Sequence, residues 1–217
     1  MIEPSKAMYI IVNCAMSVDG KIALKTKRQT RISSAEDIAR VHQLRNSVDA
    51  ILVGIGTVLA DDPKLTVNEK YVQCPKQPIR IVLDSSGRTP ENAQVLQGPA
   101  KTIIVTAEEC RRQIGNAMML RCGKGKVDVV RMVEELEKLG IKRMLVEGGG
   151  TVIWEFLSRR LVDEMNVYVG SIVIGGKDAP TVADGEGAGS LEDVIRLKLQ
   201  GIERLGDGVL LRYLVEK

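Results

Sequence analysis

The sequence has 217 residues, of which 44% are hydrophobic and 27% charged, and these proportions are typical of a globular chain with its own core. The 31 Lys and Arg residues nearly balance the 28 Asp and Glu residues, so the net charge is only +3. Because the positive charges form no stripe and aromatic residues make up 3% of the chain, nucleic acid is not expected as a partner. The N-terminal apolar run at residues 7–18 is too short to cross a membrane, so no membrane partner is expected.

Cysteine and histidine are too sparse for the common metal and hydrolase sites. Cys14, Cys74, Cys110 and Cys122 form no C-x-x-C pair, and His42 is the only histidine. We therefore expect no metal site, and Ser-His-Asp and Cys-His mechanisms are disfavoured. Four thiols without a secretory signal favour a reducing cytoplasm.

Apolar segments of strand length alternate with helical patterns, and no linker or repeat separates them, so residues 1–217 are predicted to form a single α/β domain. Early strands are expected at residues 8–17, 50–54, 78–84, 101–106 and 143–147. Further on we expect one long strand at 163–174 and an antiparallel pair at 194–203 and 209–215, turned by residues 206–208. This pattern predicts a mixed, mostly parallel central sheet flanked by helices, with a C-terminal antiparallel hairpin.

Helix boundaries are indicated by capping residues. Ser33 and Glu36 have the spacing of a capping box, which predicts a helix that ends near Ser47. Asp128 is expected to cap a second helix, and Gly140 supplies the left-handed residue that ends it.

Two glycine-containing turns follow predicted strands. Gly148, Gly149, Gly150 and Thr151 stand between a strand and a helix, where backbone amides can hold an anion, although a tight corner alone would use the same residues. Residues 54–59 nearly match the dinucleotide fingerprint G-x-G-x-x-G but lack its third glycine, so a Rossmann domain is disfavoured.

Carboxylates and hydroxyls at predicted strand and helix ends are the remaining candidates. Glu147 ends an apolar strand, where an unpaired carboxylate would be costly, and this predicts a functional role. Asp61 and Asp62 stand together at a helix break, either as an interacting pair or as a solvated turn. Residues 84–88 (DSSGR) follow a strand and combine hydroxyls with a guanidinium suited to phosphate, although a simple Asx turn explains them equally well.

These segments resemble one family along nearly the whole chain and in order. The segments AMSVDGK at 15–21, LR at 44–45, DAILVGIGTVLADDPKL at 49–65, PIRIVLDSSGR at 78–88, EGGGT at 147–151 and LVDEMNVYVGSIVIGG at 161–176 resemble the riboflavin-biosynthesis reductases. Residues 179–181 and 185–187 look like the stand-alone branch found in archaea and fungi. The resemblance implies a dihydrofolate-reductase-like fold, NADPH as the hydride donor, and a homodimer.

The resemblance also implies site residues. It places the cofactor against Ala15, Thr57, Asp61, Asp84, Ser85, Ser86, Gly148, Gly149, Gly150 and Thr151. It places the substrate against Asn13, Gln29, Arg45, Leu65 and Glu147. Bacterial relatives commonly have a lysine near Asn13 and a Ser-x-Trp stretch where this chain has Gln29-Thr30-Arg31, so the chain departs from the family pattern at these positions.

The implied reaction needs neither a metal nor a covalent nucleophile. A ribosylamine can open to an imine at C1′, and hydride delivery there yields a ribitylamine, so positioning should dominate catalysis. Glu147, or as a second candidate Asp61, would stabilise the protonated imine, and Arg45 would hold the 5′-phosphate with two hydrogen bonds.

Several alternatives stay open at this point. A dihydrofolate reductase would need a carboxylate on the first helix, where Glu36 and Asp37 stand, and a non-catalytic nucleotide-binding module would need only the glycine loop. The chain has no H-x-E or P-C-x-x-C deaminase signature, and its first strand begins by Met8, so deamination is expected from a separate protein. This favours the still-aminated pyrimidine ribosyl phosphate as substrate, with the deaminated uracil as the alternative.

Overall fold

A computed structural model describes residues 8–28 and 30–217. Its strands are β1 (Tyr9–Ser17), β2 (Ala50–Gly54), β3 (Ile79–Leu83), β4 (Thr102–Thr106), β5 (Met118–Arg121), β6 (Arg143–Val146), β7 (Glu164–Gly170), β8 (Leu197–Leu205) and β9 (Gly208–Val215). Its helices are α1 (Ala35–Asn46), α2 (Ile55–Asp61), α3 (Val129–Lys138) and α4 (Gly150–Ser158), with a 3₁₀ turn at Gln94–Leu96.

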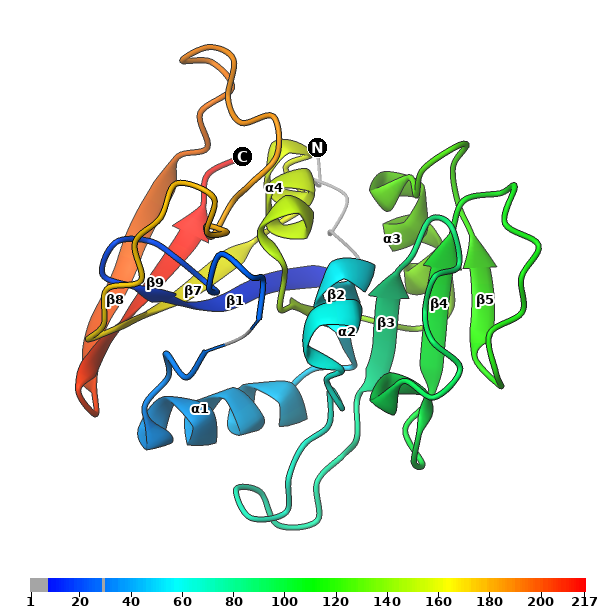
Figure 1. Cartoon of the computed structure of the whole chain (residues 1–217), viewed down its shortest axis with the longest axis horizontal. Helices are drawn as coiled ribbons and strands as arrows, with labels where there is room; N and C mark the ends of the chain where they lie inside the picture. Colours follow the sequence, from blue (N-terminus) through cyan, green and yellow to red (C-terminus); the bar gives the residue numbers. More distant parts are fainter. Residues whose placement is uncertain (1–7, 29) are drawn as a thin grey trace, which may run out of the picture.

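In the described part of the chain, the strands form one nine-stranded sheet in the order β5-β4-β3-β2-β6-β1-β7-β9-β8 (Figure 1). Every neighbouring pair from β5 to β7 is parallel, and only β9 and β8 run antiparallel to their neighbours. The mixed, mostly parallel sheet with a C-terminal hairpin is therefore confirmed.

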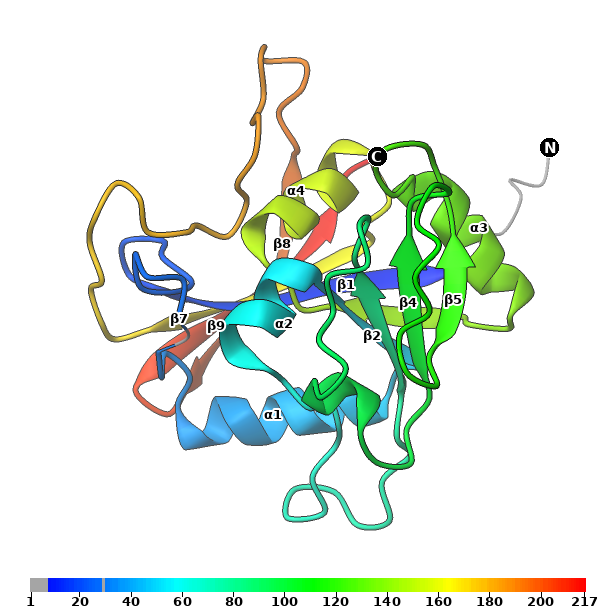
Figure 2. The ribbon, with the colours of Figure 1, turned by 45° about the vertical axis from the view of Figure 1, so that its right-hand side comes forward.

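The central strands are apolar on both sides because helices cover both sides (Figure 2). Ile10 and Val12 of β1 belong to the core beneath α3 and α4, whereas Ile11 belongs to the opposite core, which includes Val58 of α2. Helix α1 lies on the same side of the sheet as α2 and contributes Leu44 to that core (Figure 1). Odd-numbered positions of β1 therefore face α1 and α2.

Two strand predictions differ from the structure, and one strand was not predicted. The strand predicted at 194–203 runs from Leu197 to Leu205. The strand expected at 163–174 ends at Gly170, because the next residues bond to the loop after β1: Val18 N donates to Ile172 O, and Asp19 accepts from the amide of Ile174. Strand β5 was not expected. It has four residues, none of them buried, and their sequence shows no alternation of apolar and polar side chains.

The capping predictions are right for one helix and displaced by one residue for the other. Asp128 accepts hydrogen bonds from the amides of Val130 and Arg131, and Gly140 has φ +84°, as predicted. Helix α1, however, is capped by Ser34, which accepts from the amide of Asp37 at 3.2 Å. The predicted Ser33–Glu36 capping box is wrong, since the Ser33 hydroxyl bonds to a side chain instead of an amide.

Candidate active site

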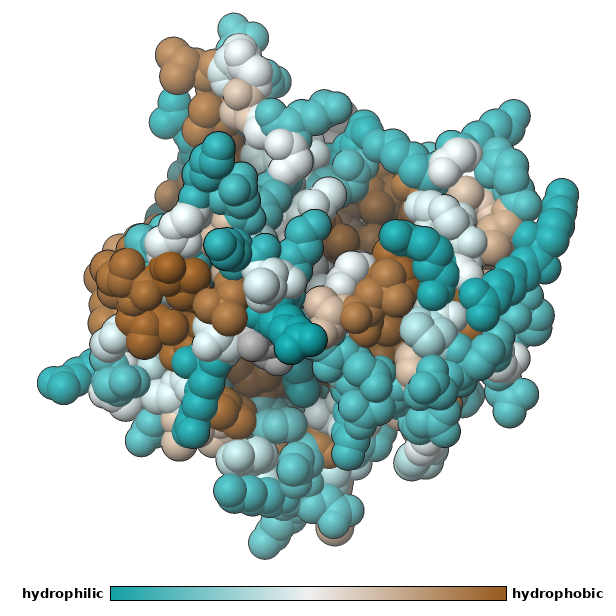
Figure 3. Space-filling view, in the orientation of Figure 1, coloured by the Kyte–Doolittle hydropathy of each residue, from teal (hydrophilic) through white to brown (hydrophobic). Residues whose placement is uncertain are grey.

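A cavity of about 1010 Å³ lies at the carboxyl ends of the central strands, which is the usual ligand edge of a parallel sheet. Its wall is formed by the end of β1, one side of α1, most of α2, the start of α4 and the loop around residues 180–184. In the view of Figure 3, the surface is hollowed near the centre of the molecule. Glu147 and Arg45 line this cavity together.

The Glu147 carboxylate forms a bidentate ion pair with the Arg45 guanidinium. Arg45 Nε donates to Oε1 at 2.9 Å and Nη2 to Oε2 at 2.7 Å, while Nη1 donates to the Thr66 carbonyl at 3.2 Å. The exposed fraction is 10% for the Glu147 side chain and 20% for that of Arg45, so little water screens the pair. Burial lowers the pKa of Arg45, but the charge and hydrogen bonds of Glu147 act oppositely and raise it overall.

This geometry bears on the phosphate contact expected for Arg45. A bidentate phosphate contact would need the same N–H fork that Glu147 already occupies. In the structure, Arg45 Nε and Nη2 orient the Glu147 carboxylate at the cavity wall, so a bidentate phosphate contact at Arg45 would have to displace that carboxylate. Other cationic side chains line the cavity, namely Lys27, Arg31, Arg88 and Lys126.

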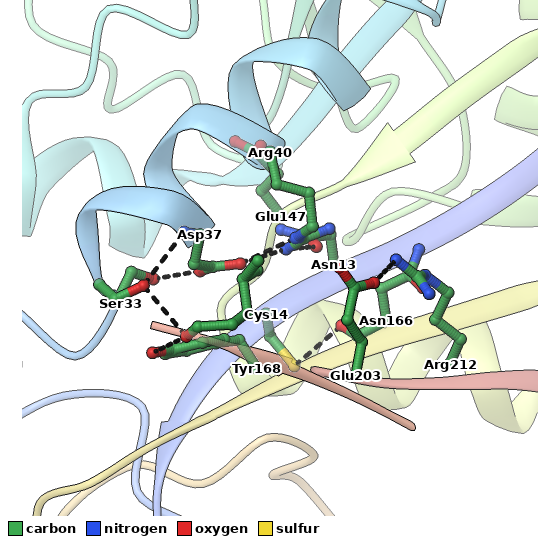
Figure 4. A network of polar contacts seen from close by, with 12 residues as sticks. Asn13, Cys14, Ser33, Asp37, Arg40, Glu147, Asn166, Tyr168, Glu203 and Arg212 are labelled. Atoms are coloured by element: carbon green, nitrogen blue, oxygen red, sulfur yellow. Dashed lines mark hydrogen bonds and ion pairs between the residues drawn. The ribbon is translucent and has the colours of Figure 1, made fainter. Parts of the chain in front are cut away.

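A second polar chain reaches the cavity from the start of α1 (Figure 4). The Ser33 hydroxyl donates to Asp37 Oδ2 at 2.5 Å, and Arg40 Nε donates to Asp37 Oδ1 at 2.8 Å. Arg40 Nη2 donates to Asn13 Oδ1, also at 2.8 Å. Sequence reasoning placed Asn13 in the substrate site but missed Arg40, whose only local signal was its i,i+3 spacing from Asp37.

The glycine loop has the conformation that its sequence demands. Gly148 has φ +112°, a left-handed value that favours glycine, and the peptide bond between Gly148 and Gly149 is cis. Gly149 caps α4, and a side chain at Gly150 would collide with the Thr181 carbonyl and the Asp184 carboxylate. Gly149, Gly150 and Thr151 line the cavity, whereas Gly148 is not among its lining residues and accepts a backbone hydrogen bond from Gly54.

The residues predicted at the end of β3 separate into different environments. Ser85 and Arg88 line the cavity, and Ser86 is exposed outside it. Asp84 is fully buried, and one of its oxygens accepts from both the amide and the hydroxyl of Thr89, at 2.7 Å each. The other oxygen has no hydrogen-bond partner within the described residues.

The remaining predicted contacts are also placed. Ala15, Thr57 and Asp61 line the cavity. Leu65 is 3% exposed, belongs to the core with α2, and is not among the lining residues. Gln29 lies outside the described residues.

Cys14 and His42 also line the cavity, although sequence reasoning gave neither a place in the site. Burial raises the pKa of the Cys14 thiol to about 12. The His42 ring stacks on Tyr71 with centroids 4.7 Å apart, and its Nδ1 accepts from the Asn68 amide. Burial lowers the pKa of His42.

Residues 8–28 and 30–217 contain no cluster of three or more His, Cys, Asp or Glu side chains placed to hold a metal ion. The helices in these same ranges are all too short or too polar to cross a membrane.

The site and fold define an α/β protein whose cavity, at the carboxyl edge of its sheet, is lined by both charged and apolar side chains. The family model of the RibD C-terminal domain matches residues 8–211, and the chain belongs to this family.

Two archaeal relatives match along almost their full length. The chain is 41% identical over 216 residues to the 2,5-diamino-6-ribosylamino-4(3H)-pyrimidinone 5′-phosphate reductase of Methanothermobacter thermautotrophicus, covering 96% of this chain and 98% of that protein. It is 41% identical over 212 residues to the protein of the same name from Archaeoglobus fulgidus, covering 92% and 94%.

Solved structures share the fold. RibD of Acinetobacter baumannii superposes with a TM-score of 0.83 at 26% identity, and the match covers 98% of this chain but only 59% of that one. The riboflavin biosynthesis reductase Rib7 of Saccharomyces cerevisiae superposes with a TM-score of 0.77 at 23% identity, covering 100% and 93%.

Proposed function

We propose that this protein uses NADPH to reduce the ribosylamino group of 2,5-diamino-6-ribosylamino-4(3H)-pyrimidinone 5′-phosphate to a ribitylamino group, a step of riboflavin biosynthesis. The observation that carries the proposal is the Glu147 carboxylate, held by Arg45 at the wall of a cavity of about 1010 Å³. The names of the two archaeal relatives support the same substrate.

The cavity residues fit a nicotinamide dinucleotide. Ser85, Arg88 and Lys126 offer hydroxyl and cationic groups, and the start of α4 at Gly149–Thr151 offers backbone amides. A bound NADPH would supply the hydride. We assign cofactor contacts to these residues and to Ala15, Thr57 and Asp61, which line the same cavity.

Glu147 has the position and charge to favour the reactive form of the substrate. When the ribosylamine opens, protonation of the C1′ imine creates a cation that accepts hydride more readily. A carboxylate fixed next to that cation stabilises it before and during transfer, at no cost in reorganisation. Arg45 keeps the carboxylate in one orientation through two hydrogen bonds.

The proposed function is tested by following NADPH oxidation with three substrates in parallel. We expect turnover with the diaminopyrimidinone, much slower turnover with the deaminated uracil analogue, and none with dihydrofolate. Preference for the uracil would reverse the proposed order of reduction and deamination. Turnover of dihydrofolate alone, or of no substrate, would contradict the proposal.

Cofactor choice gives a separate prediction. Because Arg88 and Lys126 line the same cavity as Ser85, the cavity should bind the 2′-phosphate of NADPH, and NADPH should bind more tightly than NADH. Titration of nicotinamide fluorescence measures both dissociation constants, and Arg88→Met should narrow the difference. Equal affinities in the unsubstituted protein would contradict this assignment.

We also propose a homodimer in a reducing cytoplasm. Strand β8 leaves the edge of the sheet open and carries exposed apolar side chains, at Leu197, Leu199 and Ile202, which supports self-association. All four cysteines are free thiols, which supports the reducing compartment.

A further inference from the structure

Two arginines of α1 hold two neighbouring polar side chains at the carboxyl edge of the sheet. Asn13 and Glu147 each follow the last matched pair of the β1–β6 register, Val12 and Val146, so they lie side by side on the face that α1 covers. Arg40 donates to Asn13, and Arg45 donates to Glu147. Asn13 and Glu147 both line the cavity.

The contact with Arg40 fixes the orientation of the Asn13 amide. A guanidinium has only N–H donors, so the atom of Asn13 that meets Nη2 at 2.8 Å must be the carbonyl oxygen. The NH₂ group is then at the other end of the amide. Asn13 is only 6% exposed, and its NH₂ group donates to no acceptor in the described part of the chain.

Asp37 in turn fixes Arg40. Its two oxygens are taken by Arg40 Nε at 2.8 Å and by the Ser33 hydroxyl at 2.5 Å, and the side chain is only 1% exposed. Asp37 is not among the residues that line the cavity, so it is not placed to receive a pterin ring, as the dihydrofolate alternative requires. The hydrogen bond from Arg40 to Asp37 therefore helps to point the Arg40 guanidinium towards Asn13.

We propose that Asp37 and Arg40 are positioning residues that orient the Asn13 amide, so that its NH₂ group donates to a carbonyl oxygen of the pyrimidinone. This inference rests on the proposed function and deepens it. The cavity then presents a fixed donor at Asn13 beside a fixed acceptor at Glu147. A substrate that places a carbonyl oxygen against the Asn13 NH₂ group is favoured over one that does not. The reason is that a buried N–H left without a partner is costly.

Asn13→Asp tests the polarity of this contact. The aspartate keeps the oxygen that Arg40 grips but replaces the NH₂ donor with a second oxygen, which repels a substrate carbonyl. We expect KM for the pyrimidinone to rise about 10- to 100-fold, while the dissociation constant of NADPH changes by less than about threefold. An unchanged KM would overturn the proposal.

The paired substitution Asp37→Asn with Arg40→Gln tests the positioning role without leaving a lone buried charge. We expect KM to rise about 10-fold with NADPH binding preserved, and Arg40→Lys, which keeps one donor, to show a smaller rise. Glu36→Gln, at an exposed carboxylate of the same helix, is the matched control and should leave KM unchanged. If Asn13→Asp raises KM and the paired variant does not, the positioning role is wrong.

The orientation is also measured without any substrate. In ¹⁵N-labelled protein, the side-chain amide resonances of Asn13 should shift in the paired variant and stay in place in Glu36→Gln. If the Asn13 resonances shift in the paired variant but the protein does not turn over the pyrimidinone, the proposed function fails while the orientation of Asn13 by Arg40 stands. If the Asn13 resonances are identical in the unsubstituted protein, the paired variant and Glu36→Gln, the proposed orientation of Asn13 by Arg40 is wrong.

Discussion

Glu147 stands at a position where burial makes a carboxylate costly unless it is paired, and Arg45 supplies that pair. We expect Glu147→Gln to lower kcat by about 10²–10³, because an amide cannot stabilise the cationic imine as a carboxylate does. NADPH affinity should change little. Steady-state kinetics and fluorescence titration measure the two effects.

Circular dichroism must accompany these kinetics, since the substitution leaves Arg45 without its charged partner. Glu135→Gln, at an ion pair on the surface of α3, is a control that should change neither rate nor folding. Normal turnover by folded Glu147→Gln would refute the catalytic assignment.

Cys14 should be chemically silent despite lining the cavity. Its pKa is raised to about 12 by burial, so at pH 8 only about one thiol in 10⁴ is ionised, and the thiolate is the reactive form. Cys74 is exposed and should react instead. Alkylation with iodoacetamide at pH 8, read by peptide mass spectrometry, should modify Cys74 and spare Cys14; rapid labelling of Cys14 in the folded protein would contradict its burial.

At the scale of elements, Asp19 joins the loops that follow β1 and β7. Its carboxylate accepts from the Ser17 hydroxyl and from the amides of Ile174 and Gly175, and these hydrogen bonds lower its pKa from 3.8 to about 2. A carboxylate with a depressed folded-state pKa stabilises the fold above its unfolded pKa and loses that effect as the pH falls towards 2.

The resulting prediction compares Asp19→Asn with the unsubstituted protein. The variant should unfold more easily at pH 6, and the difference in the free energy of unfolding should shrink between pH 4 and pH 2. Urea denaturation at each pH measures it. A difference that stays constant over this range would show that the charge of Asp19 contributes nothing to the loop contact.

At the scale of the whole molecule, β8 is the long open edge of the sheet. We expect the protein to sediment at twice the 23.7 kDa mass of the chain, with β8 of each subunit in the contact, because an apolar edge strand pairs readily with a copy of itself. Leu199→Lys with Ile202→Lys should shift the protein to monomer in analytical ultracentrifugation.

A second exposed apolar area provides the control. Figure 3 shows apolar surface gathered at the left of the molecule, over the loops that follow β1 and β7, where Val18 and Val173 are exposed. Val173→Lys should leave the dimer intact. If it dissociates the dimer and the β8 variant does not, the contact surface lies on these loops.

Local patterns predicted most elements because their causes lie within a few residues. Three such predictions are confirmed: the buried strand at 50–54, the cap at Asp128 and the helix end at Gly140. Each of them depends only on residues close by in the sequence. The end of β7 could not be predicted in this way. It depends on Asp19, whose carboxylate accepts from the amide of Ile174, 155 residues further along the chain.

The sequence by itself determined that Glu147 needs a partner, since it directly follows an apolar strand and a lone buried carboxylate is costly. Only the tertiary structure decided that the partner is Arg45, 102 residues away, and that Arg40 meets Asn13 in the same manner. The physical reason is the strand order. Pairing of β1 with β6 sets Asn13 beside Glu147, and α1 crosses the same face, so the choice of partner depends on packing that local periodicity does not encode.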